Sequence, residues 1–469
     1  MDDSVQARSP KVTGYLPDER PSVAKLLLFA FQQVLVMLPA TVTVALLTGF
    51  HVSTTIFASG LATICFLFIT RGKIPLYYGS SFSYIAAVVG ITGAKFGIPA
   101  TNALISQAQF GIIMSGFVSI AAGLVVSRFG MDKIERVLPP TVTGSIALVI
   151  GISLAGVALR SAFVFSPTAA VPSIAYPHAV IIVALVTLLS TIIFSVYLKG
   201  VWSQIPILLG ILVGYLVAIP FGLINFSSIF SGALITPPHF TLPTVSWPAV
   251  LAIMPIAIAT IPESTAHLFQ LDIYVKDLAR RKGKDPNSYH IADKLGLNLI
   301  GDGIGDIVAS VFGGPGGTNY GENISTMAIT KNFSVVMLGV AAVIAMLLSF
   351  VAPLSNAVLS VPSAVINGAC IFLFGVIAAQ GIAIMINKKV DLFSARNLAV
   401  IATILIIALG GTYGFADGMI PFFGAKLPPI AAGAIFGILL NLILSIGKPA
   451  DEELFESSAE EFDTPGAEE

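Results

Sequence analysis

Long apolar runs recur along almost the whole chain, and they limit the possible folds more than any other feature. Of the 469 residues, 56% are apolar and only 10% are charged, whereas soluble domains have about 45–50% apolar and about 25% charged residues. A helix needs about 20 mostly apolar residues to cross the hydrocarbon core of a bilayer. Many of the runs reach or approach that length. The sequence therefore predicts an all-α polytopic membrane protein, with a mean hydropathy of +0.92.

Fourteen runs are interpreted as membrane spans, of which the third, ninth and tenth are short or interrupted. They cover residues 24–48, 54–70, 76–93, 106–127, 139–159, 177–198, 205–224, 248–270, 294–311, 320–331, 334–353, 360–386, 396–413 and 427–446. With the N-terminus in the cytoplasm, only Lys95, Arg160 and Lys426 of the 24 Lys and Arg residues fall on the outer side. Because basic loops stay inside, the charges support fourteen spans in the inner (plasma) membrane with both termini cytoplasmic.

A glycine-rich break, residues 313–317, precedes the tenth span. Its sequence Gly-Gly-Pro-Gly-Gly cannot continue a helix, because Gly is conformationally loose and Pro lacks a backbone donor. At membrane depth, broken backbone is tolerated only where it is buried in protein or lines a water-filled cavity. Glu322 follows the break. An acid beside unwound backbone inside a membrane indicates a binding site.

The third span carries a similar pattern. Residues 78–81 (Tyr-Gly-Ser-Ser) parallel residues 320–323 (Tyr-Gly-Glu-Asn). The fifth and twelfth spans each carry two glycines seven residues apart, Gly144 and Gly151, and Gly368 and Gly375. Spans 3 and 5 thus match spans 10 and 12, and an odd offset of seven reverses their orientation in the membrane. This predicts an inverted repeat of seven plus seven spans, which is typical of secondary transporters.

Few acids remain away from the loops and tails: Glu263, Asp302, Asp306, Glu322 and Asp417. A buried carboxylate without a partner is costly, so each is expected to be protonated, paired or exposed to an aqueous cavity. Asp417 is expected in an outer turn with a structural role. Asp302 and Asp306 share a helix face before the break. Asp302 is a candidate proton relay; the alternative is that both acids stabilise the end of a short span.

Glu263 and His267 stand four residues apart, so they share one helix face. A carboxylate in contact with an imidazole favours the charged form of both. A histidine that titrates near neutral pH is a candidate proton carrier; the alternative is a buried pair that fixes helix packing. No His-Glu-x-x-His pattern and no cysteine pair at ligand spacing is present, so no metal site is predicted.

Phe82 occupies the repeat partner of the tenth-span site. An aromatic side chain there could stack on a planar ligand, while nearby backbone donors meet the ligand's carbonyl groups. The alternative is lipid or core packing, which accounts for most of the 31 Phe residues.

At these residues the chain resembles the nucleobase–ascorbate transporter family, and within it the bacterial uracil permeases. The resemblance extends over nearly the whole chain except the two tails and is carried by residues 72–82, 138–144 and 318–324. The family signature is matched by Glu322-Asn323-Ile324-Ser325 with Thr330-Lys331 at its end. Two positions depart from the family pattern: Ser325 replaces the signature glycine, and Gln33 replaces the histidine of a Gln-His pair in the first span.

The resemblance implies a division into two domains. A core domain would comprise residues 24–127 and 248–353, and a gate domain residues 139–224 and 360–446. A cytoplasmic tail of residues 1–23 and an acidic, disordered cytoplasmic tail of residues 447–469 would flank them. Short strands and half-helices of spans 3 and 10 would hold the substrate, and the gate domain would form a homodimer.

The resemblance also implies the roles of the site residues. Glu263, Phe82, Gly321 and Glu322 would contact the nucleobase, and Tyr320 is also expected to bind it. Glu263, His267 and Asp302 would serve proton coupling. Glu at the first signature position is more typical of pyrimidine carriers than of purine carriers. We therefore expect import of uracil by proton symport, with the core moving against the gate, and without a cofactor. A nucleic-acid partner is not expected at a net charge of −1.

Three alternatives remain open. Ser325 and Gln33 leave room for a carrier of xanthine, hypoxanthine or another planar base. An anion exchanger or channel could share the architecture, although no Arg or Lys stands near the breaks and two acids do. A membrane enzyme is the weakest alternative, because no nucleophile, metal set or cofactor motif accompanies Glu263 and His267.

Overall fold

The computed structural model describes residues 14–94, 97–130, 138–163, 178–200, 202, 205–230, 232–415, 418–422 and 425–446. Asp417 lies outside these residues. The chain forms two compact units, which are described separately: unit 1 comprises residues 1–128 and 158–372, and unit 2 comprises residues 129–157 and 373–469. The division into core and gate domains stays a prediction.

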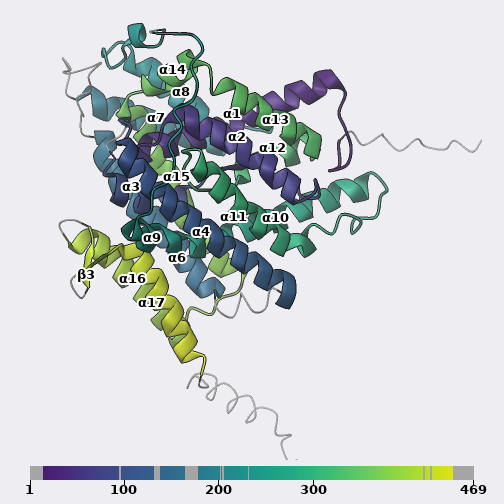
Figure 1. The fold of residues 1–469 in the computed structure, drawn as a ribbon, viewed down its shortest axis with the longest axis vertical. Helices are drawn as coiled ribbons and strands as arrows, with labels where there is room; N and C mark the ends of the chain where they lie inside the picture. The colour runs from purple at the N-terminus through teal and green to yellow at the C-terminus, as the bar shows by residue number, and fades with distance from the viewer. Residues whose placement is uncertain are drawn as a thin grey trace, which may run out of the picture. The chain divides into compact units, whose positions relative to one another are not determined.

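Unit 1 contains most of the helices (Figure 1). Its described elements are α1 (Val23–Thr48), α2 (Val52–Ile69), β1 (Tyr78–Ser80), η1 (Phe82–Tyr84), α3 (Ile85–Thr92), α4 (Asn102–Phe129), α7 (Ala179–Tyr197), α8 (Pro206–Ala218), η3 (Phe226–Ser228), α9 (Trp247–Ile253), η4 (Met254–Ile256), α10 (Ala257–Arg281), η5 (Ala292–Lys294), α11 (Leu295–Val311), β2 (Gly317–Asn319), α12 (Gly321–Thr330), α13 (Val335–Leu348) and α14 (Ala352–Leu359). The η elements are short 3₁₀ helices.

Unit 2 contains α16 (Ala395–Gly414), β3 (Ile420–Phe422), β4 (Ala425–Leu427) and α17 (Pro429–Leu444). Two helices, α6 (Pro140–Phe163) and α15 (Ser363–Asn387), run from one unit into the other. Within unit 2, a Cβ at Gly381 of α15 would lie 2.5 Å from the carbonyl oxygen of Gly144 of α6. Gly144 of the predicted repeat thus permits close helix packing. Its counterparts are not all so placed, because a Cβ at Gly375 would meet no atom within 4 Å.

The predicted helical fold is confirmed, because each predicted span coincides with one or more of these helices. Among the described residues, eight helices are long and apolar enough to cross a membrane, and four shorter apolar helices accompany them. The third span consists of a short strand followed by helical turns, as predicted. In the tenth, the half-helix α12 fills the predicted range and the strand β2 lies just before it. The fold class therefore follows from the apolar pattern.

Several helix ends differ from the predicted boundaries. The seventh span ends at Ala218, where Pro220 and Gly222 follow and Pro cannot continue a helix. The eighth continues in α10 as far as Arg281 with Pro262 inside the helix, beyond the predicted end at residue 270. The eleventh ends at Leu348, and α14 follows as a separate short helix. A hydropathy pattern shows which residues can lie in lipid. It does not show where a helix ends or where it continues beyond the membrane into water.

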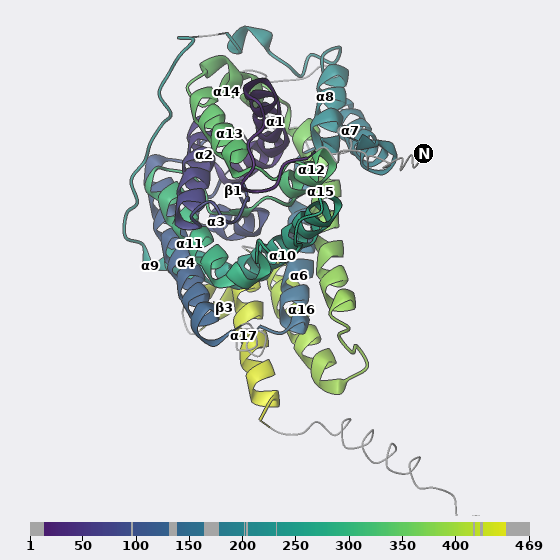
Figure 2. The same ribbon diagram turned by 90° about the vertical axis from the view of Figure 1, so that its right-hand side faces the viewer.

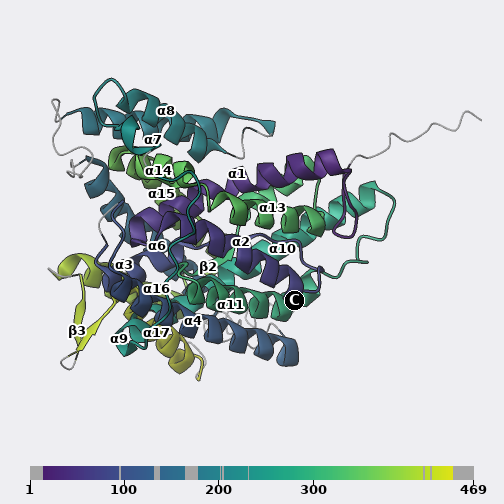
Figure 3. The same cartoon turned by 45° about the horizontal axis from the view of Figure 1, so that its top comes forward.

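The core of unit 1 is built around α2, which packs against both α11 and α13. A Cβ at Gly60 of α2 would lie 2.5 Å from the carbonyl oxygen of Ala342 of α13, so a larger residue would force these helices apart. The strand β1 lies among α1, α2 and α3 (Figure 2). The helices α7 and α8 lie side by side (Figure 3).

An extended stretch, residues 232–246, runs along the outside of unit 1 toward α9 and is called the outer segment (Figure 2). Its Thr236 amide donates to the Phe350 carbonyl at 2.9 Å. The Thr54 hydroxyl of α2 donates to the His239 carbonyl at 2.8 Å. The Gln109 side chain of α4 donates to the Thr241 carbonyl at 2.8 Å. These bonds fasten the outer segment to three different parts of unit 1.

Residues 14–19, which we call the N-terminal strap, lie against the C-terminal end of α12. Tyr15 donates its amide to the Lys331 carbonyl and accepts from the Phe333 amide, both at 2.8 Å. The next residue of the strap, Leu16, is fully buried. Lys331 ends α12 in the left-handed conformation. The strap therefore holds the residue at which this half-helix stops.

Glu19 fastens the strap to the loop after α10. Its carboxylate binds the ammonium groups of Lys282 and Lys284 and the Leu16 amide. Burial alone would raise the pKa of Glu19, but these hydrogen bonds outweigh it and lower the pKa from 4.5 to about 2. Glu19 is therefore ionised at neutral pH and holds both lysines.

Candidate binding site

The two breaks in the helical pattern meet as a pair of antiparallel strands in unit 1. Tyr78 of β1 faces Asn319 of β2, and Ser80 faces Gly317. Two further backbone bonds extend the ladder, from the Ser81 amide to Gly316 at 3.0 Å and from the Tyr320 amide to Tyr77 at 2.9 Å. Antiparallel pairing is what two chain halves of opposite orientation would produce. The 3₁₀ turn η1 and the half-helix α12 begin just after the strands, so the N-terminus of a helical segment lies at each end of the ladder.

Side chains from α2 hold β1 in place. The Ser59 hydroxyl donates to the Tyr78 carbonyl at 2.8 Å, and the Thr63 hydroxyl accepts from the Tyr78 amide at 3.1 Å. These hydroxyls satisfy the edge of β1 that faces away from β2. A buried backbone without such partners would be strongly unfavourable.

Asp306 of α11 ties the strands to the helices. One oxygen accepts from the Tyr78 hydroxyl at 2.6 Å and from the Gly317 amide at 2.8 Å. The other accepts from the Tyr84 hydroxyl at 3.0 Å. The side chain is 2% exposed and its oxygens are fully engaged. Asp306 therefore has a structural role at the ladder.

Glu263 lies on α10 and faces η1. Its Oε2 accepts from the Ser83 hydroxyl at 3.3 Å and from the Ser81 hydroxyl at 3.5 Å. Ser81 also caps η1, because its hydroxyl accepts from the Ser83 amide at 3.2 Å. The residue is only partly buried. One carboxylate oxygen is thus anchored, and the side chain keeps some access to solvent.

His267, one turn further along α10, lies against the first residue of α12. A Cβ at Gly321 would come within 2.8 Å of the imidazole Nε2. The imidazole Nδ1 is buried and has no hydrogen-bond partner among the described residues. The expected contact between Glu263 and His267 is not seen: none of the ion pairs in the described part of the chain joins them. Although they share a helix face, Glu263 bonds η1 and His267 packs on α12.

Glu322 occupies the first turn of α12 and is partly buried. It is close enough to Glu263 for their charges to interact. A helix N-terminus favours a negative charge there. The next residue, Asn323, donates its side-chain amide to the carbonyl of Gln33 at 3.1 Å and to the Gln33 side chain at 2.7 Å. Gln33 of α1, the departure from the family pattern, thus holds the turn that carries Glu322.

Asp302 is buried beside a network of uncharged polar groups. The Asn298 side chain donates to the Ser264 hydroxyl at 2.7 Å, and the Asn319 side chain donates to both at 3.1–3.2 Å. Asp302 interacts with Ser264 and Asn319, yet its Oδ1 has no partner by hydrogen-bond geometry among the described residues. An acid with a spare buried oxygen can accept a proton, which keeps the predicted relay open.

Tyr320 and Phe82 take different positions at the ladder. The Tyr320 hydroxyl is bonded to Thr41 of α1 at 2.8 Å and to the Ser80 carbonyl at 3.1 Å. A Cβ at Gly79 would lie 2.3 Å from its ring. Tyr320 is thus part of the frame of the site. Phe82 is partly buried at the start of η1. Their contacts with a ligand stay predictions.

Sequence reasoning missed the hydroxyl and amide groups that assemble the site. These are Ser59, Thr63, Ser83, Ser264, Asn298, Asn319 and Thr41. Asn298 and Asp302 stand four residues apart on α11, and that spacing was the available signal. Ser325 is partly buried on α12, and none of the described contacts explains serine in place of glycine there.

Comparisons with known proteins agree with this architecture. The sequence model of a family described as the Permease family matches residues 24–417. The chain belongs to this family. It is 35% identical to the uracil permease of Bacillus caldolyticus over 448 residues, which are 94% of this chain and 96% of that protein. It is 34% identical to the uracil permease of Bacillus subtilis (strain 168), covering 90% and 92%. For the uracil permease of Escherichia coli (strain K12) the identity is 33%, with 91% and 93% covered.

Solved structures share the fold. The transmembrane domain of the cyanobacterial bicarbonate transporter BicA matches with a TM-score of 0.53 at 14% identity, covering 90% of this chain and 97% of that one. The murine anion transporter Slc26a9 matches with a TM-score of 0.63 at 13% identity, covering 95% and 73%. At such identities the likeness concerns the fold alone. Membership of a permease family makes the chain a multi-pass membrane transport protein rather than an enzyme.

Proposed function

We propose that this permease imports a nucleobase, with uracil as the first candidate, by proton symport. One observation carries the proposal: two acids stand at the β1–β2 ladder, Glu263 of α10 bonded to Ser83 of η1 after β1, and Glu322 in the first turn of α12 after β2. Uracil offers two ring N–H donors and two carbonyl acceptors on an uncharged ring. Carboxylates accept from the N–H groups, and helix N-termini donate to carbonyls. The names of the relatives agree with this choice.

The acids divide the work in the proposed mechanism. Glu263, anchored by Ser81 and Ser83, accepts a hydrogen bond from one ring N–H. Glu322 accepts from the other N–H, or donates to a carbonyl when protonated. The amide of Gly321 meets a carbonyl. Binding of a proton near Glu263 removes repulsion between the two acids, so proton and base bind together.

His267 and Asp302 are proposed to serve proton coupling. Both border Asn319, and each keeps a buried nitrogen or oxygen without a partner among the described residues. In this proposal, neither His267 nor Asp302 forms a hydrogen bond with the base. A movement of the predicted core domain against the predicted gate domain would then expose the site to either side of the membrane.

Uptake into liposomes tests the proposal. We expect purified protein to take up labelled uracil faster when a proton gradient is directed inward, whether the medium contains sodium or choline. Glu322→Ala should lower uptake at least about tenfold, because a charged hydrogen-bond partner is lost. Asp277→Asn, a change of an exposed acid on the last turns of α10, serves as the matched control. Uptake that ignores the gradient, or that Glu322→Ala leaves intact, contradicts the proposal.

A purine carrier is the second candidate, because Ser325 and Gln33 alter the neighbourhood of Glu322. Competition by unlabelled uracil, cytosine, thymine, xanthine, hypoxanthine and adenine separates the two. Uracil should compete most strongly. The proteins that share the fold are a bicarbonate transporter and an anion transporter, but two neighbouring carboxylates repel an anion. Bicarbonate and chloride should therefore fail to compete.

A further inference from the structure

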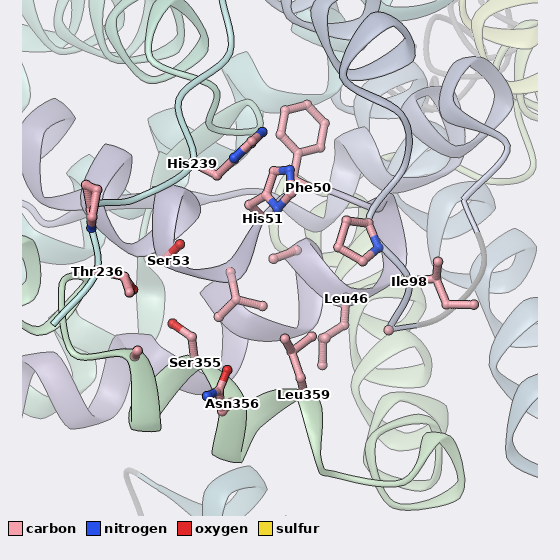
Figure 4. Close-up of a pocket in the computed structure, with 16 residues that line it drawn as sticks. Leu46, Phe50, His51, Ser53, Ile98, Thr236, His239, Ser355, Asn356 and Leu359 are labelled. Carbon is pink, nitrogen blue, oxygen red and sulfur yellow. The ribbon is translucent and has the colours of Figure 1, made fainter. Parts of the chain in front are cut away.

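A cavity lies in unit 1, and none of the residues of the β1–β2 ladder lines it. Its volume is about 250 Å³, and sixteen residues from four segments line it (Figure 4). The segments are residues 45–53 around the start of α2, residues 97–99, residues 236–239 of the outer segment and residues 352–359 of α14. None of the residues proposed to bind the base belongs to it. We call it the outer cavity, because the predicted topology assigns the loops in all four segments to the outer side.

The outer cavity is lined by uncharged groups. No Asp, Glu, Lys or Arg occurs among its sixteen described lining residues. Drug-sized ligands occupy pockets of about 300–1,000 Å³, so this smaller cavity suits a single-ring solute. An anion would find no fixed positive charge among these residues. The walls therefore favour a small neutral molecule.

Two polar groups in the wall are available to a ligand. The Nε2 of His51 and the hydroxyl of Ser355 are buried and have no hydrogen-bond partner among the described residues. Both residues line the cavity (Figure 4). Buried polar atoms without partners are rare in proteins, and each calls for an explanation. A ligand with both N–H and carbonyl groups would satisfy them.

Two imidazole rings, tilted relative to each other, border the cavity. The ring centroids of His51 and His239 are 4.2 Å apart with an interplanar angle of 50°. His239 is held by Asn102, whose Oδ1 lies 3.1 Å from the imidazole Nε2. Burial, together with His239, lowers the pKa of His51, so its ring is neutral at pH 7. A neutral imidazole can stack on a planar ring and can donate or accept a hydrogen bond.

We propose that the outer cavity is a second binding site for a planar, neutral heterocycle that carries N–H and carbonyl groups. This inference rests on the proposed function, because the same chemical class binds at the ladder. The site would collect the base at the outer side before it reaches Glu263 and Glu322. A metal site is disfavoured, because no cluster of three or more His, Cys, Asp or Glu is found in the part of the chain that the structure describes.

The experiment measures weak binding after the central site is disabled. Full-length Glu322→Ala protein in nanodiscs is titrated with uracil, and contacts are detected by saturation-transfer NMR. We expect residual binding, at least about tenfold weaker than in the wild type. Adding His51→Gln and Ser355→Ala should abolish the residual signal. Adding His178→Gln instead, a change of an exposed histidine before α7, should leave it intact.

The outcomes separate this inference from the proposed function. If wild-type protein binds and transports uracil but Glu322→Ala protein shows no residual signal, the second site does not exist and the transport function stands. If the triple variant with His51→Gln and Ser355→Ala keeps the signal, as the double variant with His178→Gln does, the residual site lies elsewhere. If wild-type protein neither binds nor transports any base, the proposed function itself fails.

Discussion

Gly321 lies against the imidazole of His267, which restricts the residues that this position can hold. Any side chain at this position would begin 2.8 Å from the Nε2 of His267, closer than real Cβ contacts allow. The first turn of α12 is therefore in direct contact with His267, the proposed proton-coupling histidine. Small changes here should act on binding without unfolding the helix, because α12 is also held by Asn323 and by the strap.

We expect Gly321→Ala to raise the KM for uracil about tenfold or more, because a displaced turn or imidazole weakens at least one hydrogen bond to the base. Counterflow uptake in liposomes measures the effect. Gly90→Ala is the matched control, since a Cβ at Gly90 of α3 meets no atom within 4 Å. Equal KM values for both variants would show that the crowding at Gly321 does not matter.

At the residue scale, the sequence was informative about charges and uninformative about their partners. Glu263, His267, Asp302 and Glu322 stand out because charged or titratable groups are rare in apolar spans. Ser264 and Asn298 do not stand out, because hydroxyl and amide groups are common there and cost much less to bury. Gln33 was noticed only as a departure from a family pattern. Its contact with Asn323 required the packing of α1 on α12.

The ladder between β1 and β2 is the element on which the site is mounted, and Asp306 is its fastening. Asp306→Ala would leave the Tyr78 and Tyr84 hydroxyls and the Gly317 amide without an acceptor. We expect the free energy of unfolding to fall by about 3 kcal/mol or more. Asp306→Asn keeps one acceptor oxygen and should lose less. Thermal unfolding in detergent compares both with Asp277→Asn, for which a change within about 0.5 kcal/mol is expected. A small effect of Asp306→Ala would argue against this fastening.

The N-terminal strap depends on the charge of Glu19. Because the folded-state pKa of about 2 lies below the ordinary 4.5, its stabilising contribution is fully present above about pH 4.5 and is lost as the pH falls toward 2. Partly exposed ion pairs contribute about 0.2–1 kcal/mol. We expect Glu19→Gln to speed hydrogen exchange in residues 14–20 by up to about fivefold at pH 7.

Exchange measured on wild type and variant at the same pH removes the intrinsic pH effect. The difference between the two proteins should shrink as the pH is lowered from 4.5 to 2. A difference that persists unchanged at pH 2 would show that Glu19 acts through something other than its charge. Peptides from α13 provide the internal control, since they are expected to exchange alike in both proteins.

At the element scale, the two breaks in the helical pattern were predictable from the sequence. Their correspondence to each other was inferred from the internal repeat. Gly and Pro in residues 313–317 exclude a helix by their chemistry. The N-terminal strap was not predicted, because residues 1–23 show only polar composition. Docking of Tyr15 uses the backbone groups of Lys331 and Phe333, which take up their positions only when α12 has formed and ended.

For the whole molecule, loops that the charge rule places together also meet in space. The four segments around the outer cavity all contain loops assigned to one side. The strap, the loop after α10 and the residues after α12 all belong to the other. The relative sidedness therefore agrees with the predicted topology. Which side faces the cytoplasm stays a prediction.

Cysteine labelling decides the orientation. In a background with Cys65→Ala and Cys370→Ala, we expect an impermeant maleimide to label H178C in intact cells and to label S458C only after permeabilisation. The physical reason is the excess of Lys and Arg on the inner loops, which resist translocation. The reverse pattern would place both termini outside. Uptake of uracil by the background protein confirms that it is folded.

The pairing of Tyr78 with Asn319 has a consequence for how the chain is made. The two strands are about 240 residues apart in the sequence, so β1 leaves the ribosome long before β2 exists. Until β2 has been made, Ser59 and Thr63 can bond the backbone groups on one edge of β1. The backbone groups on its other edge lack their partners in β2 during that time. Such distant contacts form slowly. The binding site is thus completed only after the tenth span has been inserted, and a chain truncated before that point would carry an exposed half-site for quality-control proteases to recognise.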